Sequence, residues 1–141
     1  MNKIEKLFET IKITPKNIDL YRSALTHPSC NANNKSKYED YDKLEFMGDA
    51  VLGFVTADLA FAFHPEMSEG KLTKLRSNIV KRDSLANYAR KIDLNEYIHA
   101  NKSFTPEVLA KSDKILEDVF EAIIGAIYLD GGFVAGQATK I

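Results

Sequence analysis

Apolar residues recur along this chain with the spacing of helices. Between residues 4 and 11 they fall three and four positions apart, which predicts an amphipathic first helix. A second helix is expected to begin with Thr14 as the N-cap and Pro15 at the first helical position. The Asn-, Lys- and Ser-rich segment 31–36 predicts an exposed loop. Since apolar residues nowhere alternate cleanly with period two, the predicted fold class is all-α.

A long helix is predicted from about residue 41 to residue 63, where His64 and Pro65 end it. Apolar residues between 72 and 79 predict another amphipathic helix, and Asp83 is expected to cap the next one. The Tyr and Phe side chains fall mostly at positions expected to be core. They are therefore not read as platforms on which bases stack.

The last third of the chain repeats the same signals. Thr105 and Pro106 form a second cap-and-proline pair, and an acidic helix is predicted from about residue 112 to the Asp-Gly-Gly sequence at 130–132. Residues 133–141 are expected to begin a further helix that the chain end truncates. With 141 residues, 45% of them hydrophobic, the chain is predicted to form one globular domain spanning residues 1–141.

Charge and composition argue against some classes of protein but do not select a single class. The net charge is -1, although basic residues are concentrated between residues 71 and 91, where a solvated helix face and a phosphate-binding surface both remain open. Cys30 is the only cysteine, so no intrachain disulfide can form, and no signal-peptide pattern opens the chain. No stretch is expected to approach the roughly 20 apolar residues of a membrane span. A cytoplasmic protein without a membrane partner is therefore expected.

Two acidic pairs stand out among the predicted helices. Glu45 and Asp49 are four apart, and Asp118 and Glu121 are three apart, so each pair shares a helix face with Cβ atoms roughly 5–6 Å apart. Asp42 falls on the first of these faces. Carboxylates so close repel, and partial burial makes their charges costly unless a cation compensates them.

A divalent cation is the simplest compensator for these pairs. Because neither His nor Cys lies nearby in sequence, the ligands would be hard oxygens, which suit Mg²⁺ or Mn²⁺ better than zinc. The alternative, that these are ordinary surface acids, stays open on spacing alone. Gly48 and Gly125 each weaken a helix, which indicates that another element approaches closely at these positions.

Several segments together resemble the catalytic domain of the ribonuclease III family, a helical endonuclease domain that cuts double-stranded RNA. The most specific is KLEFMGDAVL at residues 43–52. The others follow in the family's order: ALTHPS (24–29), KLRSNIV (74–80), SLA (84–86) and KILEDVFEAIIGAIYLDGG (114–132).

The resemblance implies a role for each acidic residue of the two pairs. The metal-binding catalytic carboxylates would be Glu45, Asp49, Asp118 and Glu121. Glu121 and Asp49 would be the residues most directly engaged in hydrolysis, with Mg²⁺ as the cofactor and Mn²⁺ as its substitute. Asp42 stands where many members carry Glu, and would be an auxiliary acid. Glu117 points about 100° away from Asp118 and is expected to be solvated rather than a fifth ligand.

The resemblance also implies a homodimer in which each subunit cuts one RNA strand. The products would carry 5′-phosphate and 3′-hydroxyl ends and a short 3′ overhang. Phe46 matches the aromatic residue that inserts across the dimer interface, and an ordinary core Phe remains the alternative. His27 is expected to form structural hydrogen bonds rather than to act as a base.

Typical bacterial members continue into a double-stranded-RNA-binding domain, and the sequence contains no such domain, so RNA binding by this chain is expected to be weak. Two other functions are weighed. One is a non-catalytic RNA-binding or ribosome-associated protein of the same fold, a class that usually loses some of the carboxylates. The other is a di-iron helical bundle, which needs two Glu-x-x-His motifs. This chain has only one, at Glu96 and His99.

Overall fold

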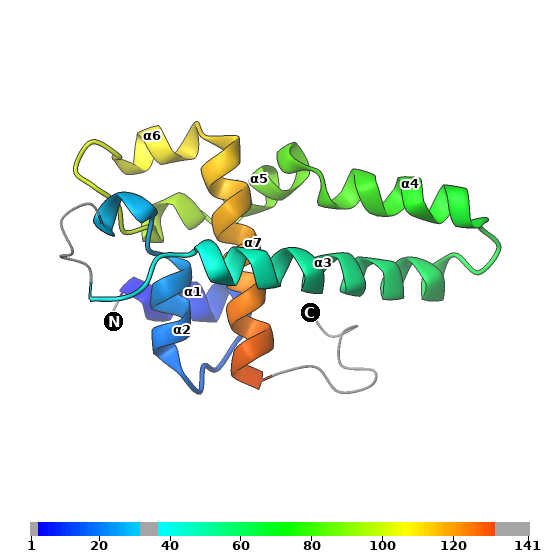
Figure 1. The fold of residues 1–141 in the computed structure, drawn as a ribbon, viewed down its shortest axis with the longest axis horizontal. Helices are drawn as coiled ribbons and strands as arrows, with labels where there is room; N and C mark the ends of the chain where they lie inside the picture. Colours follow the sequence, from blue (N-terminus) through cyan, green and yellow to red (C-terminus); the bar gives the residue numbers. More distant parts are fainter. Residues whose placement is uncertain (1–2, 32–36, 132–141) are drawn as a thin grey trace.

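The computed structural model describes residues 3–31 and 37–131, and these residues form a helical fold (Figure 1). In this part of the chain the only β-type pairing is an isolated bridge between Thr26 and His99, which confirms the all-α prediction. The helices are α1 (Lys3–Ile11), α2 (Ile18–Ala24), α3 (Asp42–Phe63), α4 (Glu69–Val80), α5 (Arg82–Lys91), α6 (Pro106–Ala110) and α7 (Asp113–Gly131), with short 3₁₀ turns η1 (Pro28–Asn31) and η2 (Leu94–Tyr97).

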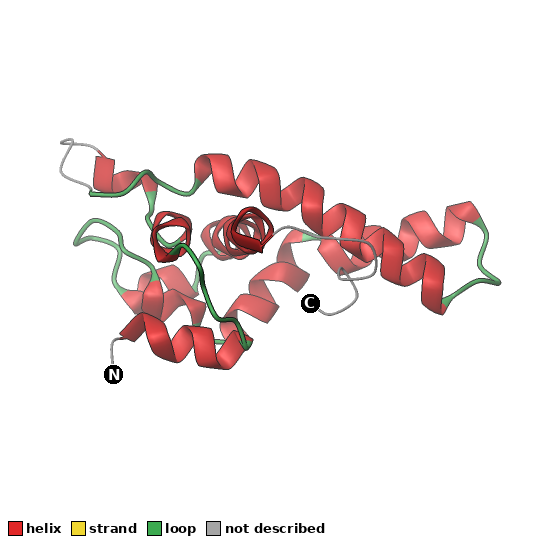
Figure 2. Ribbon diagram, turned by 90° about the horizontal axis from the view of Figure 1, so that it is seen from below, coloured by secondary structure: helices red, strands yellow, loops and turns green. Residues whose placement is uncertain are grey.

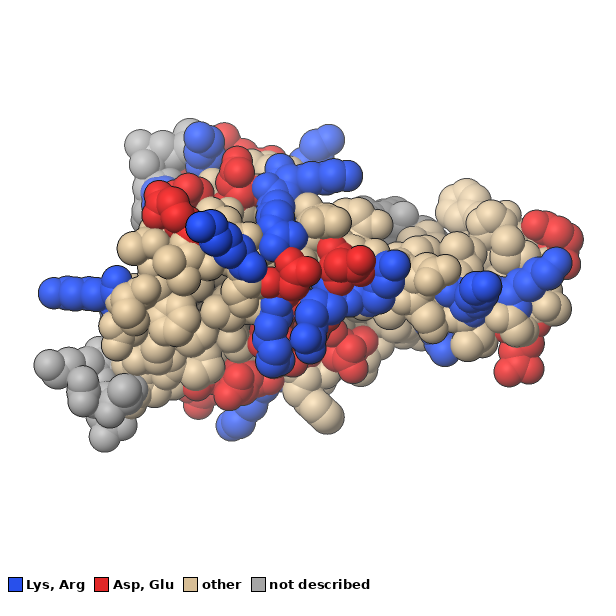
Figure 3. All heavy atoms as spheres, turned by 90° about the horizontal axis from the view of Figure 1, so that it is seen from above, with Lys and Arg blue, Asp and Glu red and all other residues tan. Residues whose placement is uncertain are grey.

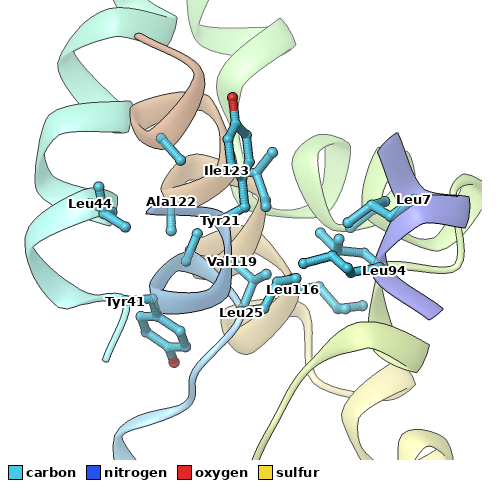
Figure 4. Close-up of a cluster of buried hydrophobic side chains, with 14 of the residues drawn as sticks. Leu7, Tyr21, Leu25, Tyr41, Leu44, Leu94, Leu116, Val119, Ala122 and Ile123 are labelled. Atoms are coloured by element: carbon cyan, nitrogen blue, oxygen red, sulfur yellow. The ribbon is translucent and has the colours of Figure 1, made fainter. Parts of the chain in front are cut away.

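The core forms around α7, which packs against α2, α3, α5 and α6. Its apolar residues are buried on several sides because neighbours surround the helix rather than covering one face of it. Leu116 and Val119 meet Leu7 of α1 and Tyr21 of α2 in one buried cluster (Figure 4). A smaller cluster joins Val51 and Val55 of α3 to Ile124 of α7. These two clusters hold the acidic helices α3 and α7 together.

Beyond the core, α4 and the end of α3 form a projecting arm, here defined as residues 56–80. Both ribbon views show these two helices extending past the others (Figures 1 and 2). No residue of α4 is buried, and all four phenylalanines of α3 are exposed: Phe46, Phe54, Phe61 and Phe63. The expectation that the aromatic residues are mostly core is therefore wrong for α3.

Among the described residues, α3 is the one helix whose length and composition would allow it to cross a membrane. This corrects the expectation that no stretch approaches that length. Several acidic residues lie along α3, and the helix packs against α7, so we assign it as a core helix of the fold.

Two predicted helix starts are wrong. The second helix begins at Ile18 with Asn17 as its N-cap, rather than at Thr14 and Pro15. Lys81, not Asp83, is the N-cap of α5, and Asp83 lies in the first turn. By contrast, Thr105 caps α6 as predicted, with its side chain accepting a hydrogen bond from the backbone of the third helical residue. The helix predicted over residues 133–141 lies outside the described residues.

Candidate metal centre

The site is built where α3 and α7 cross at two glycines. A Cβ atom added to Gly48 would overlap the backbone carbonyl group of Glu121, and one added to Gly125 would overlap the carbonyl oxygen of Leu44. The absence of side chains at both positions lets the two backbones touch. The close approach predicted from these glycines is confirmed, and it brings the acidic faces of the two helices together.

Three carboxylates meet at this crossing. One oxygen from each of Glu45, Asp118 and Glu121 lies within 4.8 Å of the other two. Asp118 and Glu121 are only 5% and 6% exposed, which is unusual for acidic residues. These three residues, called the carboxylate trio below, bring together three of the four predicted ligands.

Asp49, the fourth predicted ligand, lies beside the trio rather than in it. Its exposed side chain shares a hydrogen bond with Glu121. Burial, followed by this hydrogen bond and the charge of Asp49, raises the pKa of Glu121 to about 9. In the absence of a cation, Glu121 therefore holds a proton at neutral pH.

The other acids respond to the same crowding. Burial and the charge of Asp118 raise the pKa of Glu45, while burial and the charge of Asp40 raise that of Asp42. Asp42 is exposed at the start of α3, where it belongs to the pocket wall but not to the trio. Asp42 therefore lies near the trio, and its auxiliary role stays a prediction.

The acids border an open pocket of about 360 Å³, lined by Asp42, Glu45, Phe46, Asp49, Val80, Glu117 and Glu121. Carboxylate oxygens that are close, mostly buried and mutually repulsive form a donor set suited to a hard divalent cation. The residues present therefore fit a metal ion. In contrast, Glu96 and His99 belong to no such group among the residues described, which leaves the di-iron alternative without a site.

Glu117 differs from the expectation of a solvated acid. Its side chain is 17% exposed, lines the pocket, and lies 3.5 Å from Arg82 of α5, measured between Oε2 and Nε. The 100° angle between neighbours on a helix did separate Glu117 from the trio. It could not reveal that the next helix, α5, brings a cation to Glu117 and encloses it.

Lys114 is a charged neighbour that sequence reasoning missed. Its Nζ atom lies 3.3 and 3.2 Å from the two carboxylate oxygens of Asp118. This hydrogen bond and the charge of Asp118 raise the pKa of Lys114. The spacing could have revealed this contact, because Lys114 and Asp118 are four residues apart and such residues are neighbours on a helix.

Phe46 is 79% exposed although it borders the acidic pocket. The alternative of an ordinary core Phe is therefore wrong. The start of α3 beside Phe46 is held by a hydrogen bond from the Tyr41 N–H to the Thr26 carbonyl. His27 Nδ1 accepts a hydrogen bond from the Ser29 N–H, consistent with the structural bonding expected of this residue.

The profile of ribonuclease-III-like domains matches residues 17–140, which is most of the chain. The chain belongs to the ribonuclease-III-like family. Curated relatives named Ribonuclease 3 include one from Onion yellows phytoplasma, 42% identical over 142 residues, and one from Francisella philomiragia, 45% identical over 128 residues. These alignments cover 97% and 91% of this chain but 57% and 52% of the relatives. The chain thus spans about half the length of the curated relatives it matches.

The fold agrees with this family. The nuclease domain of ribonuclease III from Campylobacter jejuni has a TM-score of 0.82 and 35% sequence identity, covering 92% of this chain and 87% of that one. That solved structure is described as flexible in a region involved in dimer formation. The helical ribonuclease III fold predicted from the sequence is therefore confirmed.

Proposed function

We propose that this chain is the catalytic domain of a metal-dependent endoribonuclease that hydrolyses double-stranded RNA, leaving 5′-phosphate and 3′-hydroxyl ends. The observation that carries this proposal is the carboxylate trio, buried at the crossing of α3 and α7 in a ribonuclease-III-like fold. All four acids that the family resemblance singled out surround this crossing. Their presence favours an enzyme over the non-catalytic alternative.

Glu45, Asp118 and Glu121 would hold Mg²⁺, or Mn²⁺ in its place, with Asp49 beside them. Bound there, the cation would make water more acidic and stabilise the negative charge that develops on the phosphate. The side chains themselves position the ion and exclude competing cations of softer preference. Glu121 must release its proton when the ion binds, so ion binding should strengthen as pH rises.

We further propose that two copies of this chain associate through α3. Phe46, Phe54 and Phe61 are exposed and lie within about 80° of one another around the helix, forming what is called the apolar stripe below. A continuous apolar face of this kind indicates a protein partner. A second copy fits because the stripe begins at Phe46, on the pocket wall, so each copy would lie beside the other's acids. Two pockets acting on opposite strands would leave the short 3′ overhang.

The basic residues of α4 are available to RNA phosphates in this arrangement. Lys71, Lys74 and Arg76 are exposed, and none of the ion pairs among the described residues involves them. Figure 3 shows basic side chains along the arm and acidic ones at its tip, while acidic and basic side chains are interspersed on the body. This sparse positive surface supports weak, salt-sensitive binding of RNA.

Cleavage of a perfect RNA duplex by the 141-residue chain tests the proposal. We expect cutting in Mg²⁺ and none in excess chelator, with 5′-phosphate ends on the products. Glu121→Gln should lower the rate at least about a hundredfold, because a group that organises transition-state charge is removed. Glu9→Gln, an exposed acid on α1, is the matched control and should cut at the wild-type rate.

Full metal-dependent cutting by Glu121→Gln would overturn the assignment of the site. Duplex binding without any turnover by the wild-type chain would instead support the non-catalytic alternative.

A further inference from the structure

Lys114 contacts the carboxylate trio at Asp118, one of its two buried members, and nothing in the proposed reaction yet uses Lys114. The Lys114 ammonium group spans both carboxylate oxygens of Asp118, at 3.3 and 3.2 Å. Asp118 also shares a hydrogen bond with Glu45. This carboxylate therefore contacts both Lys114 and Glu45 in the metal-free protein.

The position of Lys114 is not explained by helix stability. It is the second residue of α7, at the positive end of the helix dipole, where an acidic residue is favoured and a basic one is not. Its pairing order is also the weaker one, because an acid that precedes a lysine by four residues stabilises a helix better than the reverse. Because both local preferences disfavour a lysine at this position, we look for the role of Lys114 outside the stability of the helix.

That benefit lies in the unequal burial of the two partners. The Lys114 side chain is 62% exposed, whereas the Asp118 side chain is almost completely buried. An exposed lysine gains little from an ion pair and can turn into solvent at low cost. A buried carboxylate without a cation, in contrast, is strongly unfavourable. The contact therefore matters mainly to Asp118.

We propose that Lys114 is a positioning residue that acts as the resident counter-cation of Asp118 until a divalent metal ion displaces it. This inference rests on the proposed metal-dependent function. Lys114 orients the Asp118 carboxylate and balances the negative charge of the trio in the metal-free protein. It also opposes metal binding, because its charge must move away from the oxygens that the ion takes. Lys114 thereby sets the metal concentration at which the site fills.

Arg82 provides a contrast within the same site. Its ion pair is with Glu117, which lies outside the trio, and so a metal ion has no need to break it. Only Lys114 competes directly for a carboxylate of the trio among the ion pairs of the described residues.

The proposal predicts opposite effects on protein stability and on metal affinity, whereas a lysine with a purely structural role would affect both in the same direction. Removing a structural support would lower stability and weaken metal binding. Removing a displaced counter-cation should lower the stability of the metal-free protein but tighten metal binding. For Lys114→Met we expect the dissociation constant for Mn²⁺ to fall about three- to tenfold, the effect of deleting one screened repulsive charge at the rim. In chelator, its Tm should fall by about 2–5 °C.

Binding of Mn²⁺ to the full 141-residue chain, followed by electron paramagnetic resonance of the free ion, tests this without RNA. Thermal unfolding in chelator and in saturating Mn²⁺ gives the second readout. Lys114→Arg keeps the charge and should bind Mn²⁺ within about twofold of wild type, as should Lys6→Met on α1, a helix that contributes nothing to the pocket.

Tighter Mn²⁺ binding by Lys114→Met, with Lys114→Arg near wild type, supports the proposal. Unchanged or weaker binding by Lys114→Met overturns it while leaving the metal centre intact. If the wild type binds Mn²⁺ no better than Glu121→Gln does, the metal centre itself fails, and this inference fails with it.

Discussion

At its crossing with α3, helix α7 buries acidic side chains, whereas α3 leaves phenylalanines exposed to solvent. At the crossing, Asp118 and Glu121 are almost inaccessible. Along the apolar stripe, Phe46, Phe54 and Phe61 are exposed. The usual arrangement of apolar residues inside and charges outside is inverted at both places.

The proposals above give the two regions one explanation, which is that each binds a partner. The crossing collects negative charge that a cation would neutralise, and the stripe collects apolar surface that a second chain would cover. Stability was given up at both places, since buried carboxylates and exposed aromatic rings each cost free energy. Because Phe46 belongs to both the stripe and the pocket wall, the proposed metal and dimer sites adjoin.

The largest effect is expected from closing the space between α3 and α7. Gly48→Ala would place a methyl group in the backbone of Glu121 and force the helices apart, so we expect a loss of about 4 kcal/mol or more in the free energy of unfolding. Gly53→Ala, on the same helix with open space around it, should instead stabilise the protein by up to about 1 kcal/mol. Urea unfolding of both variants measures the difference, and equal effects would contradict the crossing geometry.

Substitutions in the apolar stripe should weaken the association of two copies rather than the folding of one. We expect Phe54→Ser combined with Phe61→Ser to weaken dimerisation at least about a hundredfold, or about 2.7 kcal/mol, because two buried rings are lost from the interface. Sedimentation equilibrium over a concentration series measures this change.

Phe63→Ser provides the matched control for the stripe. Phe63 is also exposed but lies about 180° around α3 from Phe54, so its substitution should leave dimerisation unchanged. If Phe63→Ser weakens the dimer as much as the double variant does, the interface lies on another face.

The raised pKa of Glu121 at the crossing predicts a pH-dependent stability. Burial, then the hydrogen bond with Asp49, raises the folded-state pKa of Glu121 from 4.5 to about 9. Between these values the folded chain holds a proton that the unfolded chain has released. In chelator, the free energy of unfolding should therefore fall as pH rises from 6 to 8, by about 1.4 kcal/mol per unit.

Denaturant titrations at several pH values test this slope. Saturating Mg²⁺ should reduce it, since the ion favours the charged carboxylates, and Glu121→Gln should remove it. A wild-type slope that persists in Glu121→Gln would assign the proton to another group.

The smallest effect is expected where α7 ends, away from both regions. Asp130 accepts hydrogen bonds from the Lys16 and Asn17 N–H groups at 2.9 and 2.7 Å, and from the Tyr21 hydroxyl at 2.9 Å. Asp130→Asn should cost about 1 kcal/mol, because charge-assisted hydrogen bonds become neutral ones. A double-mutant cycle with Tyr21→Phe measures their coupling, and strictly additive effects would show that this bond contributes nothing.

The predicted and observed helix starts show what local sequence signals can and cannot predict. Thr14 and Pro15 form a good start signal, yet α2 begins three residues after Pro15, because Asp130 holds the backbone N–H groups of Lys16 and Asn17. That partner is more than 100 residues away in sequence. A local pattern cannot anticipate a bond formed only after the chain has folded.

The sequence by itself determined the helices, the acidic pairs on their faces and the need for close approach at Gly48 and Gly125, since these depend on spacing within one helix. The tertiary structure decided which carboxylates meet. It placed Asp49 beside the trio, enclosed Glu117 against Arg82, and exposed Phe46 to solvent. The physical reason is that burial and charge pairing depend on the angle and distance between helices, which periodicity along one chain does not specify.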